Sequence, residues 1–138
     1  MRFGKRSTEN LNSAHPDLVR VANKALSYGV MDFSVIEGHR SVERQKELYD
    51  DGKSKIDGIN RKGKHNYTPS RAIDIMPYPA TVNGVNVWGD NQRWCVLAGL
   101  MFAAASEIQV NIRWGGDWDG DGNNADSSFN DYPHFEIV

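Results

Sequence analysis

The feature that most constrains the fold is a change of apolar periodicity near residue 108. Over residues 91–107, apolar side chains recur near helical spacing, at Trp94, Leu97, Ala98, Met101, Phe102 and Ala105. Directly afterwards, apolar residues alternate with polar ones, at Ile108, Val110, Ile112 and Trp114, as in a half-buried strand. We therefore expect a core helix that is followed at once by a β-strand.

Other segments predict further short elements around this pair. Apolar spacing and capping residues predict helices at residues 16–28 and 42–51. β-prone runs predict strands at 33–37, 71–75 and 134–138, and Val82-Asn-Gly-Val85 predicts a tight hairpin. Aperiodic segments predict loops at 52–64 and 115–133. Strands separated by helices of unequal length favour one small α+β domain over residues 1–138, with an antiparallel or mixed central sheet and flanking helices.

Charge and composition exclude several classes of partner. The formal net charge is −2, which does not favour nucleic acid. The N-terminus lacks an apolar signal segment, and no run reaches the roughly 18 apolar residues of a membrane span. We expect a monomer with no membrane partner and no export route of its own. The single cysteine, Cys95, lies in an apolar run and is expected to be a small buried thiol.

Charged residues are distributed unevenly along the sequence, although the net charge is small. Basic residues gather between residues 53 and 71, and aspartates gather between residues 117 and 131. Such runs are usually solvated surface. A basic loop beside a metal could instead hold an anionic substrate.

Three residues could form a metal site, although they are far apart in the sequence. His65, Asp74 and His134 offer two imidazoles and a carboxylate, and Asp131 lies three residues before the last of them. A catalytic zinc site keeps three protein ligands, so that water can occupy a fourth position and have its pKa lowered to about 7. From the residues alone, His15 and His39 are equally available as ligands.

Four stretches carry a resemblance to a known family. They are Glu37-Gly-His-Arg-Ser41 followed by Gln45, the stretch from Lys64 to Ile75, Arg113-Trp-Gly-Gly-Asp-Trp118, and Asp131-Tyr-Pro-His-Phe-Glu-Ile-Val138. Together they make the chain similar to zinc-dependent peptidoglycan peptidases related to D,D-carboxypeptidases and the vancomycin-resistance D,D-dipeptidases. The strongest similarity is to the phage-type L-alanyl-D-glutamate endopeptidases. The fold implied is that of the D-Ala-D-Ala metallopeptidases and hedgehog-like domains.

The resemblance implies a role for each matching residue. His65, Asp74 and His134 become zinc ligands, Asp131 the general base, and Arg40 a residue that holds substrate or stabilises developing negative charge. Substrate contacts are expected from Arg40, Gln45, Trp114 and Tyr132. An aspartate at the base position, where the D,D-peptidases usually have glutamate, points to the endopeptidase branch. The spacing from His65 to Asp74 exceeds the usual family spacing, so residues 66–71 are expected to bulge outward.

An acidic loop suggests a second ion. Its D-x-D-x-D-G pattern resembles the opening of a calcium loop, with candidate ligands Asp117, Asp119, Asp121 and Asn123. The twelfth position holds Ser128, where an EF-hand has a bidentate glutamate. The alternative is an acidic, glycine-rich turn without an ion.

The function implied is hydrolysis of the peptidoglycan stem peptide by a zinc metallopeptidase, most directly at the L-Ala-D-Glu bond. Such a cell-wall lysin would stay in the cytoplasm until a holin releases it, and would act in the periplasm. Two alternatives remain: a D,D-carboxypeptidase, and a non-catalytic, calcium-dependent module that binds the cell wall.

Overall fold

The computed structural model describes residues 1–122 and 130–138. Within them the helices are α1 (Lys5–Asn12), α2 (Pro16–Ser27), α3 (Val42–Asp50) and α4 (Asn91–Glu107), with short 3₁₀ turns η1 (Lys64–Asn66) and η2 (Val87–Gly89). The strands are β1 (Phe33–Glu37), β2 (Ala72–Pro77), β3 (Thr81–Val82), β4 (Val85–Asn86), β5 (Ile112–Trp114) and β6 (His134–Ile137). None of the described helices is long and apolar enough to span a membrane.

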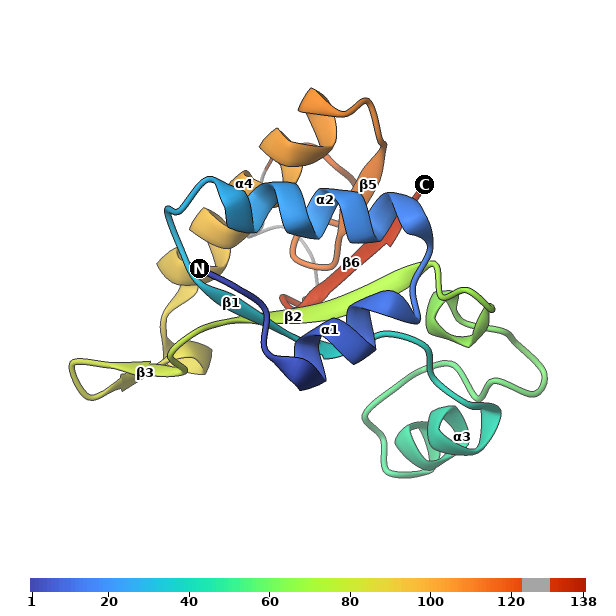
Figure 1. Ribbon diagram of the computed structural model, residues 1–138. Coiled ribbons are helices and arrows are strands. Elements are labelled where there is room, and N and C mark those ends of the chain that lie inside the picture. Colours follow the sequence, from blue (N-terminus) through green and yellow to red (C-terminus); the bar gives the residue numbers. More distant parts are fainter. Residues whose placement is uncertain (123–129) are drawn as a thin grey trace.

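The main sheet is antiparallel and has the strand order β1-β2-β6-β5. Strands β3 and β4 form the expected two-residue hairpin, which projects from the body of the protein (Figure 1). The α+β class and the antiparallel sheet agree with the prediction. Strand β2 pairs with β6 in a register that sets Asp74 opposite His134 and Ile73 opposite Phe135.

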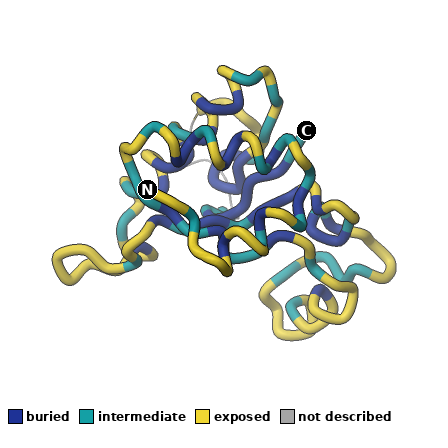
Figure 2. The backbone as a smooth tube through the Cα atoms, viewed as in Figure 1, coloured by how far each residue is buried: buried dark blue, intermediate teal, exposed yellow. Residues whose placement is uncertain are grey.

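Helices α2 and α4 pack against each other over one face of the sheet, and α1 packs against β1 (Figure 1). The buried residues follow this layer (Figure 2). Its centre contains Leu18, Val21, Leu97, Met101, Ile73, Ile75 and Phe135, all essentially inaccessible to solvent. Helix α3 and the loop after it lie apart from the other helices (Figure 1).

Strand alternation separates the core from a polar face. Ile73, Ile75 and Phe135 point to the core, so Asp74 and His134 point away from it. A register irregularity between Val35 and Glu37 sets Glu37, rather than a core residue, opposite Asp74. Polar side chains from three neighbouring strands therefore meet on one face of the sheet.

One helix was missed, and two local expectations were wrong. Helix α1 was not predicted, because its sequence is polar and only Ser7 and Leu11 are buried. The strand expected at 108–114 is shorter, since Gln109 takes a left-handed conformation with φ of 60° and its neighbours bond to the end of α4. Cys95 is exposed, because only the opposite face of α4 contacts the core.

Candidate active site

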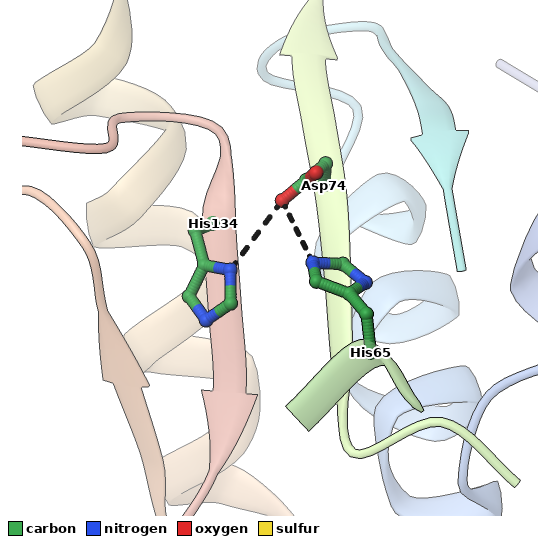
Figure 3. A group of neighbouring side chains, drawn as sticks. All are labelled: His65, Asp74 and His134. Carbon is green, nitrogen blue, oxygen red and sulfur yellow. Dashed lines mark hydrogen bonds and ion pairs between the residues drawn. The ribbon is translucent and has the colours of Figure 1, made fainter. Parts of the chain in front are cut away.

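His65, Asp74 and His134 meet on the polar face of the sheet, although they come from η1, β2 and β6. One ligand atom from each lies within 4.8 Å of the other two. Asp74 Oδ1 lies 3.2 Å from His65 Nε2 and 3.5 Å from His134 Nδ1. Figure 3 shows both imidazole rings turned toward this carboxylate. The cluster therefore has the two nitrogens and one oxygen that a single metal ion could bind.

His65 reaches the cluster because the turn that carries it is held at both ends. Asn66 accepts a hydrogen bond from the Gly63 backbone N–H at 2.8 Å, and its amide donates to the Arg40 carbonyl at 3.0 Å. The buried hydroxyl of Ser70 donates to the Ala72 carbonyl at 2.6 Å, where the chain re-enters the sheet. The residues between His65 and Asp74 thus connect η1 to β2 without separating the two side chains.

The outer nitrogen of each histidine has its own partner. His65 Nδ1 lies 2.7 Å from the Gly38 carbonyl oxygen, which can only accept, so that nitrogen carries the proton. His134 Nε2 lies 2.8 Å from Glu136 Oε1. When these outer nitrogens donate, the lone pairs of His65 Nε2 and His134 Nδ1 are directed toward Asp74. This donor set, with its oriented rings, fits the three-ligand pattern of a catalytic Zn²⁺ site.

Without an ion, hydrogen bonds and opposite charges within the cluster shift the pKa values of its side chains. Burial alone would raise the pKa of Asp74, but hydrogen bonds from His134 and His65 outweigh burial and hold it far below its ordinary value. Burial alone would lower the pKa of His134, but its bonds to Asp74 and Glu136 raise it to about 9. Asp74 is therefore already ionised, whereas His134 must lose a proton before it can bind a metal.

Asp131 lies at the edge of this cluster and remains partly open to solvent. Its Oδ2 is 3.9 Å from His134 Nδ1, and its side chain is 38% exposed. Burial and the neighbouring charge of Asp74 raise the pKa of Asp131. A carboxylate with a raised pKa, beside a possible metal site, is suited to accept a proton from water near neutral pH.

Arg40 closes the opposite side of Asp74. Its guanidinium donates to both Glu37 carboxylate oxygens, at 2.9 and 2.8 Å, and to Asp74 Oδ2 at 3.3 Å. Gln45 Oε1 accepts a further bond from Arg40 Nη1 at 3.0 Å. Asp74 thus directs one oxygen to the histidines and the other to Arg40, which holds the carboxylate plane in place.

Only some of the residues expected to contact the substrate line a groove beside the cluster. A groove of about 360 Å³ runs beside the cluster and is lined by Arg40, Gln45 and Asp131, among others. Gln45 is only 2% exposed, and its amide bonds inside the protein, whereas Tyr132 is half-buried. Trp114 was expected at the substrate, but it is 5% exposed and packs on Phe135 in the core. Trp118 lines the groove instead, with its ring centroid 5.4 Å from that of His134.

The acidic loop forms a second, separate cluster. Carboxylate oxygens of Asp117, Asp119 and Asp121 lie within 4.8 Å of one another. The hydrogen bond to Asp117 is the main cause that raises the pKa of Asp119. Asp117 Oδ1 is buried and has no hydrogen-bond partner among the residues that the structure describes. The fourth candidate, Asn123, lies outside the residues that the structure describes.

Sequence reasoning missed Glu136, Arg113 and Glu37 as parts of the site. Glu136 is 4% exposed, and it bonds His134 on one oxygen and Arg113 Nη2, at 2.8 Å, on the other. The signal was present in the alternation of the last strand, which turns residues 134 and 136 to the same face. Glu37 gave no such signal, because its orientation depends on the irregular register of β1.

Comparison with known proteins yields a consistent set of relatives. The family model described as phage L-alanyl-D-glutamate peptidase matches residues 1–138. The L-alanyl-D-glutamate peptidase of Escherichia phage T5 is 30% identical over 140 residues, covering 99% of this chain and 98% of that protein. The peptidoglycan L-alanyl-D-glutamate endopeptidase CwlK of Bacillus subtilis is 28% identical over 85% of this chain and 64% of its own length. The crystal structure of Serratia marcescens L-Ala D-Glu endopeptidase ChiX aligns over all of this chain and 90% of that one, with a TM-score of 0.76 and 36% identity.

Proposed function

The chain belongs to the phage L-alanyl-D-glutamate peptidase family, and from this premise we propose that it cleaves the L-Ala-D-Glu bond of the peptidoglycan stem peptide. The observation that carries the proposal is the convergence of His65, Asp74 and His134 beside a groove that could hold a peptide. We propose that residues 1–138 act as one catalytic domain.

We propose Zn²⁺ as the metal of this cluster, held by His65 Nε2, Asp74 and His134 Nδ1. The two nitrogens and one carboxylate support this choice, because they are the donor types of hydrolytic zinc sites. Bound there, the metal would act as a Lewis acid that polarises the scissile carbonyl and acidifies water. Glu136 and the Gly38 carbonyl would keep the two rings oriented.

The remaining chemistry falls to two residues of the chain. Asp131 would take the proton of the attacking water and pass it to the leaving amine of D-glutamate as the C–N bond breaks. Its partial exposure and its position beside His134 support this role. Arg40 would stabilise the negative charge that develops on the carbonyl oxygen. Its bonds to Glu37 and Gln45 support a preorganised guanidinium.

Digestion of purified Gram-negative sacculi tests the proposal. Mass spectrometry should identify peptides that begin with D-glutamate, and a chelator should abolish their release until zinc is restored. Loss of a terminal D-alanine alone would support the D,D-carboxypeptidase. Binding to sacculi without any product would support the non-catalytic module. Metal analysis of the purified protein tests the zinc assignment separately.

We also propose that Asp117, Asp119 and Asp121 bind Ca²⁺, together with Asn123. Asp117 Oδ1 is buried and has no partner within residues 1–122 and 130–138, which supports this second site, because a cation would satisfy it. Trp118 lies between two of these aspartates in the sequence and packs near His134. An ion in the loop would therefore stabilise one wall of the groove.

For the cellular setting, we propose release of a monomer from the cytoplasm by a holin, followed by action in the periplasm. The phage T5 relative supports a role in lysis. Fractionation of cells that express the protein with and without a holin, together with size-exclusion chromatography, tests both parts.

A further inference from the structure

The proposed substrate places a negative charge next to the bond that is cut. Glutamate carries two carboxyl groups, so one remains free even when the other forms the next peptide bond. This free carboxylate is only a few covalent bonds from the scissile nitrogen. An enzyme that prefers glutamate at this position gains from a cation that faces the groove and is not already neutralised.

The arginines near the metal cluster do not meet this need. Arg40 is bound by Glu37 and Asp74, and its side chain is only 12% exposed. Arg113 is paired with Glu136 at 2.8 Å. Both positive charges are thus largely balanced by carboxylates of the protein, and a substrate carboxylate must find another partner.

The same groove is also lined by Lys53, Lys55 and Lys64. Lys64 directly precedes His65, so its backbone is tied to the metal cluster. Neither Lys53 nor Lys64 forms an ion pair with any residue that the structure describes. Lys53 is exposed and Lys64 is half-buried, so both ammonium groups can reach a ligand in the groove.

Buried contacts hold the loop that carries Lys53 and Lys55. The Gln45 amide donates to Ser54 Oγ at 2.9 Å and to the Ile56 carbonyl at 2.6 Å. Its oxygen accepts from Arg40. Gln45 therefore joins the loop that carries Lys53 to Arg40, beside Asp74. This keeps the loop in a constant position relative to the cluster.

We propose that Lys53 and Lys64 form an anion subsite that binds the free carboxylate of the glutamate residue at the scissile bond. This lysine subsite rests on the proposed function, because it supplies specificity for the same reaction. Lysine suits the task as a compact charge on a flexible stem, which can follow a carboxylate in an open groove. The attraction should weaken as salt screens it.

The test compares two muropeptides that differ only at this carboxylate, one with the free acid and one with the carboxamide. Wild-type protein should cleave the acid with a kcat/KM about tenfold higher, as expected for a charge-assisted contact that is partly exposed. The double variant Lys53→Gln/Lys64→Gln should reduce this preference toward one, mainly by raising KM for the acid. The charge-conserving variant Lys53→Arg/Lys64→Arg should retain most of it.

The matched control is Lys5→Gln/Lys46→Gln, which removes the same net charge from exposed positions outside the groove. Its acid preference should equal that of the wild type. An unchanged preference in Lys53→Gln/Lys64→Gln, with zinc content and circular dichroism intact, would overturn the lysine subsite and leave the proposed function standing. Failure of the wild type to cleave either muropeptide at the L-Ala-D-Glu bond would instead overturn the proposed function.

Discussion

Glu136 Oε1 lies 2.8 Å from His134 Nε2, and both side chains are almost fully buried. The carboxylate also pairs with Arg113, so its position is set from two sides. Partners of this kind orient a metal-binding imidazole, fix which nitrogen carries the proton and increase its basicity. Glu136 is therefore a positioning residue for His134.

For Glu136→Gln we expect zinc affinity to fall by about 10- to 100-fold, since the amide can still accept a hydrogen bond but lacks the charge. Competition with a chromophoric chelator measures this directly, without an activity assay. Glu107→Gln, an exposed acid at the end of α4, is the control and should bind zinc like the wild type. Equal zinc affinity in Glu136→Gln and wild type would show that Glu136 is not needed to orient His134.

Asp131→Asn should separate catalysis from metal binding. A carboxamide cannot accept the proton of the attacking water, so kcat should fall by at least about 100-fold. Zinc content, thermal stability and binding to sacculi should remain close to wild type, since Asp131 is partly exposed and is not counted among the three ligands. Asp17→Asn on α2 provides the matched control. Retained turnover in Asp131→Asn would rule out this residue as the base.

The metal-free protein should be most stable between about pH 4.5 and 6.5. The His134 pKa rises from 6.5 to about 9 on folding. The stability that protonated His134 contributes is therefore fully present below pH 6.5 and is lost as pH rises through 9. The Glu136 pKa falls from 4.5 to about 2, so its contribution is complete above pH 4.5 and is lost as pH falls through 2. Folding also lowers the pKa of Asp74, so ionised Asp74, like Glu136, stabilises the fold above its ordinary pKa and loses this effect in acid.

Urea unfolding in the presence of a chelator, from pH 3 to 10, measures this profile. The loss of stability at alkaline pH should not exceed about 3.5 kcal/mol, at roughly 1.4 kcal/mol per pKa unit over the rise from 6.5 to about 9. Bound zinc should prevent most of the loss of stability above pH 6.5, because the metal takes the place of the His134 proton. A metal-free protein whose stability is constant from pH 6.5 to 9 would contradict the ionic pairing of His134.

Calcium should alter the environment of Trp118 if the acidic loop binds it. We expect a saturable change in tryptophan fluorescence on calcium addition at fixed zinc, accompanied by higher activity. Asp119→Ala/Asp121→Ala should weaken this response by at least about tenfold, because two of the oxygen ligands are lost. Trp118→Phe identifies the reporter among the four tryptophans. The calcium site is excluded if neither calcium nor the double variant changes activity at fixed zinc.

Local sequence signals predicted most of the secondary structure. Helix α4 and the hairpin formed by β3 and β4 lie where apolar spacing and the Asn-Gly pair indicated them. These signals are reliable because they depend on neighbours along the chain. They failed at α1, which has too few apolar residues. They could not place Trp114 relative to the substrate, because a buried aromatic side chain is compatible with both a groove and the core, and it packs in the core.

By itself, the sequence determined the α+β class, the extent of the main helices and, through four short stretches, the similarity to a peptidase family. Residue types alone left four histidines equivalent. Tertiary structure separated them: His15 caps α2 and His39 is exposed, whereas His65 and His134 face Asp74. The pairing of β2 with β6 decided this, because strand register is set by packing between distant segments and determines which side chains share a face.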